Sequence, residues 1–326
     1  MGRSFREYHE ARMGLVESTE VKRLALELGF TTVGIAPTDL PLDALSVYRE
    51  WLDNGFQGEM AYMTEHEPLK QDVRSLLPNA KSVIAVSLNY YQEPSTPIKV
   101  ARYALGRDYH KVLKGKLKRL AGDLGKLYPD SEWRACVDSA PILERTFAHL
   151  AGLGWFGKNT MLIDSRRGSW FFIGLLLTSV EFQPDARSVG GCGTCHKCIE
   201  ACPTGAIVQV NNRWQVDARS CISYQTIEKK GSLEVDTQGW VFGCDICQEV
   251  CPFNEIRDSQ PLRSEITTES DFLQQRNFPS LFELANLDEV HWDELTKGSA
   301  IRRPGLNGLK RNAQAVLKPS RDQHDE

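Results

Sequence analysis

The amino-acid sequence predicts an α+β protein built from three consecutive parts. Over residues 1–183, apolar runs of strand length alternate with apolar residues at helical spacing, which is the pattern of an α/β domain. Residues 184–256 hold eight of the nine cysteines. Helical spacing returns over residues 257–326, where a short helical tail is expected. A chain of 326 residues with 41% hydrophobic content is long enough for a packed core in about two domains.

The first part is expected to begin with a helix over Ser18–Leu28, because its apolar residues share one face and Gly29 follows them. Ser82–Asn89 (SVIAVSLN) is expected to be a buried strand, and so is Trp170–Thr178. The other elements expected in this part are strands over 31–36, 133–137 and 161–164 and helices over 42–55, 109–127 and 141–150. In the tail, helices are expected over 281–285, 292–295 and 306–317, followed by a disordered end over 318–326.

Four cysteines stand in tandem in the second part of the chain. Cys192, Cys195 and Cys198 are each separated by two residues, and Cys202 follows three residues later, immediately before Pro203. This is the spacing of bacterial ferredoxins, in which the fourth cysteine binds the other cluster of a pair. The motif therefore predicts that a second motif lies elsewhere in the chain.

That second motif is present in an altered form. It consists of Cys244, Cys247 and Cys251, followed by Pro252. The early ligand that it lacks is assigned to Cys221, which an insertion separates from Cys244. If each motif gives its last cysteine to the other cluster, as in bacterial ferredoxins, the eight cysteines bind two [4Fe–4S] clusters. Cluster 1 is expected to bind Cys192, Cys195, Cys198 and Cys251, and cluster 2 to bind Cys202, Cys221, Cys244 and Cys247. Zinc is the alternative, but structural zinc sites normally use separated cysteine pairs rather than a tandem run.

Composition excludes several classes of protein. The net charge of −4 predicts no partner, and the cluster assignment leaves only one cysteine, so a disulfide framework is not expected. Iron–sulfur chemistry favours the reducing cytoplasm. Residues 1–20 are charged and lack the apolar core of a signal peptide, and no apolar run approaches the ~20 residues of a membrane span. We expect a cytoplasmic protein without a membrane anchor.

Two further features have ordinary structural interpretations. Gly152, Gly154 and Gly157 match the GxGxxG dinucleotide motif, but they follow a predicted helix instead of a strand. We expect these glycines to end the helix and to allow a close backbone approach. Cys136, the remaining cysteine, is expected to be a small buried residue on a strand.

Asp138 lies at the end of a predicted strand, just before Pro141 and a predicted helix. Two interpretations stay open from the residues alone. The carboxylate can cap the helix N-terminus, as acidic residues often do. Alternatively, it can be a catalytic acid, because a desolvated carboxyl group in a pocket holds a proton near neutral pH.

Basic residues gather in two segments of the chain. The segments contain, respectively, Arg102, Arg107, Lys111, Lys114, Lys116, Lys118 and Arg119, and Arg302, Arg303, Lys310, Arg311 and Lys318. Such segments are commonly solvated helix faces. In an acidic chain, two local basic patches also indicate phosphate contact, and hence a nucleic-acid partner.

Several stretches together resemble epoxyqueuosine reductases, the cobalamin-dependent iron–sulfur enzymes of tRNA queuosine synthesis. The resemblance spans about residues 55–312. It is carried by Arg102-Tyr-Ala with Gly-Arg-Asp108-Tyr-His110, by Asp138-Ser-Ala-Pro-Ile-Leu-Glu-Arg145, by Ala151-Gly-Leu-Gly-Trp-Phe-Gly-Lys-Asn-Thr160, by the double cysteine motif, by Cys221-Ile-Ser-Tyr-Gln-Thr-Ile-Glu228 and by Phe242-Gly-Cys-Asp-Ile-Cys-Gln248.

The resemblance implies a cobalamin-binding catalytic domain over 1–183, a ferredoxin-like domain over 184–256 and tail helices that contact tRNA over 257–326. It implies reduction of epoxyqueuosine to queuosine at the wobble position. An external low-potential donor would supply electrons through the clusters to base-off cobalamin and then to the epoxide. Asp138 matches the family's proton donor. The resemblance also places Arg102, Asp138, Lys158, Ser223 and Gly243 near the corrin.

Two other functions compete with this one. A corrinoid iron–sulfur reductase of the dehalogenase type would act on a small molecule with similar electron flow, and the basic segments argue against it. A ferredoxin-type electron carrier would have no use for the stretches around Asp138 and Gly152–Asn159. The leading hypothesis is the tRNA-modifying reductase, acting as a monomer.

Overall fold

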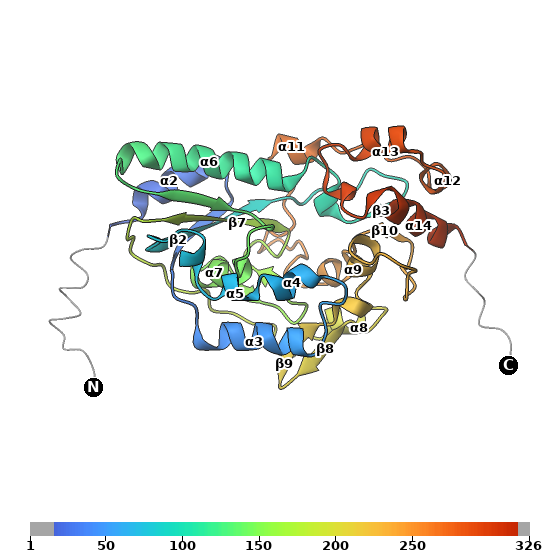
Figure 1. The fold of residues 1–326 in the computed structure, drawn as a ribbon, viewed down its shortest axis with the longest axis horizontal. Helices are drawn as coiled ribbons and strands as arrows, with labels where there is room; N and C mark the ends of the chain where they lie inside the picture. The colour runs from blue at the N-terminus through green and yellow to red at the C-terminus, as the bar shows by residue number, and fades with distance from the viewer. Residues whose placement is uncertain (1–15, 319–326) are drawn as a thin grey trace.

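The computed structural model describes residues 16–318, and a four-stranded sheet forms the centre of its first part (Figure 1). The strand order is β1-β2-β7-β4, and every neighbouring pair is antiparallel. The strands are β1 (Thr32–Pro37), β2 (Ser82–Asn89), β7 (Phe171–Thr178) and β4 (Trp133–Cys136). Alternation of strands and helices along the chain normally indicates parallel strands, so the α/β pattern of this part of the chain is realised by an antiparallel sheet.

Helices cover both faces of this sheet because its central strands are apolar on both sides. On one face pack α2 (Thr19–Glu27) and α6 (Tyr109–Leu127), which bury Val21, Leu113 and Leu117 against β2 and β7. On the other face α7 (Glu144–Leu150) buries Phe147. Figure 1 shows α2 and α6 on one side of the sheet and α7 on the other.

Short elements connect the sheet to the rest of the chain. They are α3 (Leu42–Asp53), α4 (Ala61–Glu65), α5 (Glu67–Lys70), η1 (Val73–Ser75), η2 (Arg102–Ala104), β5 (Trp155–Phe156) and β6 (Leu162–Ile163). The glycine prediction is confirmed here. Gly152 ends α7 with a φ of +82°, and a Cβ on Gly154 would lie 2.6 Å from the carbonyl oxygen of Ile163. Cys136 is buried on β4, and burial raises the pKa of its thiol to about 11, as suits an unreactive core residue.

The cysteine-rich segment is mostly loops between very short elements. They are α8 (Lys197–Glu200), the hairpin of β8 (Ile207–Val210) and β9 (Arg213–Val216), η3 (Ala218–Ser220), α9 (Ile222–Ile227), β10 (Trp240–Phe242) and α10 (Ile246–Glu249). The hairpin lies between Cys202 and Cys221, before the insertion that separates Cys221 from Cys244.

The C-terminal helices share a core with an earlier stretch of the chain. They are α11 (Ser270–Leu273), α12 (Leu281–Ala285), α13 (Glu289–Thr296), η4 (Ala300–Arg302) and α14 (Gly305–Leu317). Leu284, Leu309 and Ala313 pack with Leu105 and Phe242, and β3 (Lys99–Val100) pairs in parallel with β10. The tail helices are therefore bound to both preceding parts, close to α9 (Figure 1). The expected disordered end over 318–326 lies outside the described residues from position 319 on.

No helix within residues 16–318 is long and apolar enough to cross a membrane.

Candidate active site

Asp138 is held just beyond the end of β4 in a left-handed backbone conformation, with a φ of +49°. The prediction of a helix over 141–150 is wrong in its start, because α7 begins at Glu144 with Leu143 as its N-cap and no side-chain cap. Asp138 therefore does not cap this helix. Its side chain points to the start of α6 instead, which excludes the simpler of its two interpretations.

Three residues at the N-terminus of α6 organise the Asp138 carboxylate. Oδ2 of Asp138 accepts a hydrogen bond from the hydroxyl of Tyr109 at 2.9 Å and lies 2.8 Å from Nε2 of His110. Nδ1 of His110 lies 2.8 Å from Oδ1 of Asp108, and Asp108 also caps α6 by accepting from the backbone N–H of His110. The imidazole thus bridges two carboxylates.

These contacts decide where the proton resides. Burial by itself would lower the pKa of His110, but the two carboxylates raise it to about 9. Burial would also raise the pKa of Asp138, yet the contacts with His110 and Tyr109 lower it below its ordinary value. At neutral pH the pair is an imidazolium and a carboxylate. Desolvation alone would favour a protonated Asp138, as in the second interpretation left open from the sequence, and the neighbouring imidazolium opposes it.

A second acid lies behind Asp138. Glu144 accepts a hydrogen bond from the backbone N–H of Asp138, and burial together with the charge of Asp138 raises the pKa of Glu144 to about 8. The next residue, Arg145, donates to the carbonyl oxygen of Thr160 at 2.8 Å. Burial and a nearby like charge both favour the neutral form of the Glu144 carboxyl group.

Residues from other parts of the chain face Asp138. The ring of Tyr62 on α4 lies 5.6 Å from the guanidinium of Arg303, which forms a two-pronged ion pair with Glu228 at 3.0 and 3.1 Å. Burial raises the pKa of Tyr62 and the hydrogen bond with Glu228 raises that of Arg303, and the charge of Asp138 adds a smaller contribution to both. The site is therefore assembled from the sheet domain and the C-terminal helices.

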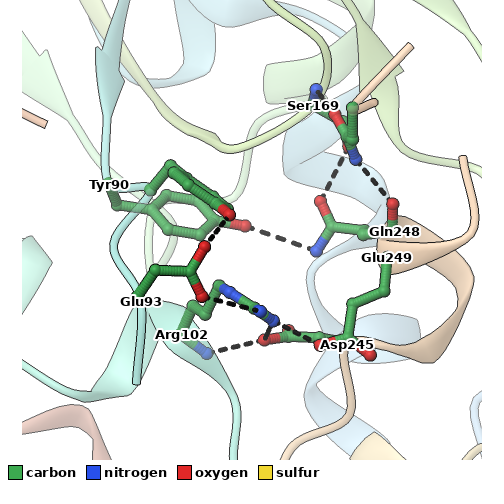
Figure 2. A network of polar contacts seen from close by, with 9 residues as sticks. Tyr90, Glu93, Arg102, Ser169, Asp245, Gln248 and Glu249 are labelled. Carbon is green, nitrogen blue, oxygen red and sulfur yellow. Dashed lines mark hydrogen bonds and ion pairs between the residues drawn. The ribbon is translucent and has the colours of Figure 1, made fainter. Parts of the chain in front are cut away.

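Arg102 joins the sheet domain to the loop that carries Cys244 and Cys247 (Figure 2). Its backbone N–H donates to Oδ2 of Asp245 at 2.8 Å, and its guanidinium contacts Asp245 at 3.3 Å and Glu249. Asp245 is 1% exposed, and burial raises its pKa to about 6 despite the guanidinium. A buried carboxylate needs such a partner, so Arg102 fixes the position of this loop.

A second set of contacts in Figure 2 fixes the same loop through uncharged groups. Gln248 accepts a hydrogen bond from the Ser169 hydroxyl at 2.9 Å and donates to the hydroxyl of Tyr90 at 3.3 Å. Asn254 donates to the Ser169 hydroxyl at 3.0 Å. All four side chains are buried, so their hydrogen bonds hold this loop against the sheet domain in one orientation.

Three of the five residues expected near a corrin meet in one corner. Gly243 lies between Arg102's segment and α9, because a Cβ there would lie 2.5 Å from the Cβ of Ala101 and its N–H donates to the Thr226 hydroxyl at 2.9 Å. Ser223 is in the same turn of α9, where its carbonyl accepts from Thr226. Within residues 16–318, the buried Nε of Arg102 has no hydrogen-bond partner.

Tyr103 connects this corner to Asp138. Burial and the charges of Asp138 and Asp245 raise the pKa of Tyr103 well above its ordinary value. Its ring packs on Tyr109 at 6.1 Å and on Phe242 at 5.9 Å. The Asp138 carboxylate and the Cys244–Cys247 loop therefore both lie near one partly buried tyrosine.

Lys158 lies elsewhere, in contact with the loop that carries the tandem cysteines. Its Nζ donates to the carbonyl oxygen of Cys195 at 2.9 Å and lies 3.1 Å from Nε2 of His196. The neighbouring Asn159 donates to the carbonyl oxygen of Cys247 at 3.2 Å. The Gly152–Asn159 stretch thus contacts both cysteine motifs.

The effects of the clustered thiols on one another's pKa values show which of them lie near each other, and Cys247 is affected by Cys198 as well as by Cys221 and Cys244. The pKa of the Cys198 thiol is raised to about 11 by burial and by Cys192, Cys251 and Cys195. Burial and the charges of Cys221 and Cys202 raise the pKa of Cys244 to about 12, and Cys247 is coupled to Cys221 and Cys244. In the described part of the chain, no three His, Cys, Asp or Glu side chains converge on one ion. Sets of four thiolates are the ligands of [4Fe–4S] clusters, so thiols of this number and spacing in the chain fit such clusters.

Six of the twelve basic side chains in the two segments make structural contacts, including Arg102 and Arg303, which are described above. Arg107 pairs with Asp271 and Lys116 with Glu269, while Arg302 pairs with Asp293. Arg311 donates to backbone carbonyls of α9 and the loop after it. The exposed residues Lys111, Lys114, Lys118 and Arg119 on α6 have no acidic partner among residues 16–318.

Sequence reasoning missed the partners of Asp138. In the sequence, His110 appears only within a stretch that carries the family resemblance, and nothing there assigns it a role. Its link to Asp138 is a contact across 28 residues, and the only local signal is Asp108 two residues before it, in the position of a helix cap. Glu144 and Asp245 were also missed, because burial of a carboxyl group cannot be read from these short motifs.

Comparison with known proteins assigns these features to a class. Residues 70–139, which end just after Asp138, match the family model described as epoxyqueuosine reductase QueG, DUF1730. Residues 191–254, which contain all eight clustered cysteines, match the 4Fe-4S double cluster binding domain. The fold and the site define an iron–sulfur oxidoreductase.

The relatives identify the family within that class. The curated epoxyqueuosine reductase of Leadbetterella byssophila is 40% identical over 306 residues, covering 92% of this chain and 98% of that protein. The chain therefore belongs to the epoxyqueuosine reductase family. The structure of epoxyqueuosine reductase from Streptococcus thermophilus has a TM-score of 0.78 and 30% identity, covering 91% of this chain and 80% of that one. An epoxyqueuosine reductase solved with a tRNA-Tyr epoxyqueuosine-modified stem loop has the same TM-score, the same coverage and 26% identity.

Proposed function

We propose that this protein reduces the epoxide of epoxyqueuosine at the wobble position of tRNA to give queuosine. The observation that carries the proposal, in a chain of this family, is that Tyr103 connects two places. It follows Arg102, which is bonded to Asp245, and it packs on Tyr109, which is bonded to Asp138. The proton donor Asp138 and the loop that carries Cys244 and Cys247 therefore lie on either side of one region of the structure, here called the seam. Reduction of an epoxide needs both, because electrons enter at carbon while negative charge develops on oxygen.

The clusters are assigned to the two groups of thiols. Cys192, Cys195, Cys198 and Cys251 would bind cluster 1, and Cys202, Cys221, Cys244 and Cys247 would bind cluster 2. The mutual effects of these thiols on their pKa values support this crossed division. Low-potential clusters would supply single electrons received from an external donor.

Base-off cobalamin is proposed for the seam between Asp138 and the corner of Arg102, Ser223 and Gly243. The unpartnered Nε of Arg102 and the Asp138 carboxylate, whose side chain is 58% exposed, support a polar cofactor there. Bound cobalamin would supply a cobalt centre able to reduce the epoxide carbon. Lys158, which contacts the cluster 1 loop, is assigned to positioning that loop beside the cofactor.

The chain's own residues prepare the acid chemistry. Tyr109 and His110 hold the Asp138 carboxylate in one orientation, and Glu144 holds its backbone. Asp138 is placed to give a proton to the oxygen as the carbon–oxygen bond breaks. Fixing a donor before the reaction avoids reorganising it in the transition state.

One anaerobic assay tests the function. Iron-reconstituted protein, cobalamin and a strong reductant are incubated with tRNA that carries epoxyqueuosine, and the digested nucleoside is weighed. We expect a loss of one oxygen atom that depends on added cobalamin. Unchanged tRNA, with both cofactors shown to be bound, would reject the function. Oxygen loss without cobalamin would reject the cobalamin assignment alone.

The exposed basic stripe of α6 is the proposed contact with the tRNA backbone. Lys111, Lys114 and Lys118 recur at helical spacing on the exposed face, and the stripe begins beside His110. Phosphate contacts made by unpaired lysines release counterions and so depend on salt.

Removing two of these charges should weaken tRNA binding in a salt-dependent way. For Lys114→Ala with Lys118→Ala, we expect the slope of log K against log salt concentration to fall by roughly 2, about one per phosphate contact. Binding is measured by titrating labelled tRNA over a range of salt. The matched control is Lys81→Ala with Arg187→Ala, which removes two exposed charges elsewhere. An equal loss of slope in both variants would show that α6 makes no specific contact.

A further inference from the structure

The proposed reaction makes a demand that a single carboxyl group does not meet. Removing an epoxide oxygen as water consumes two electrons and two protons at one oxygen atom. Oδ2 of Asp138 accepts a hydrogen bond from the Tyr109 hydroxyl and lies 2.8 Å from Nε2 of His110, and these contacts hold the pKa of Asp138 below its ordinary value. Asp138 therefore carries no proton at neutral pH, and it has to be protonated twice in each turnover.

His110 is the group placed to fill it. Its Nε2 lies 2.8 Å from Oδ2 of Asp138, and Oδ1 of Asp108 holds the opposite ring nitrogen at 2.8 Å. The His110 side chain is 35% exposed, so it can exchange protons with solvent. The ring stacks on Tyr109, with ring centroids 4.0 Å apart, which fixes its orientation.

The other proton-bearing neighbours are less suitable. Tyr109 donates to Asp138, but burial and the charge of Asp138 raise the pKa of Tyr109 well above its ordinary value, so it keeps its proton. Glu144 contacts the backbone N–H of Asp138 and not its carboxylate. The titratable and charged groups packed around the pair are Asp108 and Tyr109 from α6, Tyr103 from η2, Glu144 and Arg145 from α7, Lys70 from α5, Tyr62 from α4 and Arg303 beside η4.

We propose that His110 holds the proton that Asp138 delivers to the epoxide oxygen, and that it refills Asp138 for the second proton. This inference rests on the proposed function. A proton passes from Nε2 of His110 to Oδ2 of Asp138 and then to the oxygen, and His110 takes up another from solvent. Over one turnover two carbon–oxygen bonds break and a carbon–carbon double bond forms. The external donor supplies two electrons, solvent supplies two protons through His110, and the oxygen leaves as water.

The pH dependence follows from the environment of His110. Because the carboxylates raise its pKa to about 9, His110 carries its proton below that pH and loses it above. The single-turnover rate of the wild-type enzyme should therefore fall as the pH rises through about 9. Removing the charge of Asp108 lowers the pKa of His110, so the fall should move to lower pH in Asp108→Asn.

The test is the single-turnover rate of oxygen loss, with cofactor-loaded enzyme in excess over tRNA, between about pH 6 and about pH 10. His110→Gln keeps a hydrogen-bonding side chain but holds no transferable proton. We expect its rate to fall by about 10²-fold at neutral pH, the lower end of general acid catalysis, and its alkaline fall near pH 9 to vanish. Binding of tRNA, iron content and cobalamin content should be unchanged.

His291→Gln is the matched control, since His291 also pairs with a helix-capping aspartate, Asp288, on the exposed surface. It should keep the wild-type rate and pH profile. Wild-type rate and profile in His110→Gln would overturn the inference while leaving the proposed function intact. If His110→Gln loses its cofactors, Asp108→Asn decides, and an unmoved alkaline fall in that variant would overturn the inference. If the wild-type enzyme leaves the tRNA unchanged, the proposed function itself is overturned.

Discussion

Asp138→Asn is expected to keep both kinds of cofactor and to lose turnover by about 10²- to 10⁴-fold, the range for removal of a general acid. Asparagine has nearly the shape of aspartate and can accept hydrogen bonds from Tyr109 and His110, so the site should keep its form. It cannot carry a proton to the oxygen that leaves. The measurement is the rate of queuosine formation under reducing anaerobic conditions.

The control for this variant is Asp130→Asn, which changes an exposed aspartate in the turn after α6. It should have wild-type activity. Iron content, cobalamin binding and tRNA binding are measured for both variants, because a loss of cofactor would give the same inactivity without involving proton transfer. Full activity in a cofactor-loaded Asp138→Asn would remove Asp138 from the mechanism.

Those elements whose signal is local could be predicted from the sequence. Ser82–Asn89 and Tyr109–Leu127 have the predicted bounds, because one is a continuous apolar run and the other combines strong helical spacing with a capping aspartate. The helix before Gly152 was expected three residues too early, since Pro141 seemed suited to a first helical turn. In fact the left-handed Asp138 and the bends after it precede the helix, and this conformation is fixed by tertiary contacts with Glu144 and α6.

The candidate site divides in the same way. The spacing of the cysteines predicts two clusters because a cubane constrains its ligands locally. The sequence could not show which basic side chains have structural contacts and which are available to a partner. Arg303 and Arg311 look alike in the sequence, yet one pairs with Glu228 opposite Tyr62 and the other holds backbone carbonyls near Lys229. Such differences depend on which parts of the chain meet, and the tail helices meet the segment around Leu105.

The crossed division of the cysteines makes the second large prediction, because it separates neighbours in sequence from neighbours in space. In the proposed division, Cys198 and Cys202 are four residues apart in the sequence but bind different clusters, whereas Cys202 and Cys244 bind the same one. Cys202→Ser with Cys244→Ser should therefore lose one cluster and keep about four iron atoms per chain. Cys198→Ser with Cys202→Ser should lose both clusters and all reductase activity.

Iron and sulfide analysis of anaerobically purified protein measures both outcomes, with zinc determined in the same samples. Cys136→Ser is the control, since this buried thiol on β4 lies outside both groups and its loss should leave the iron content unchanged. If each motif instead bound its own metal, the result would reverse, and the variant altered at positions 198 and 202 would keep one cluster. The reversal would break the physical link between the motifs, because each cluster takes its fourth thiolate from the other segment and so ties the tandem cysteines to the loop that Arg102 holds against the sheet domain.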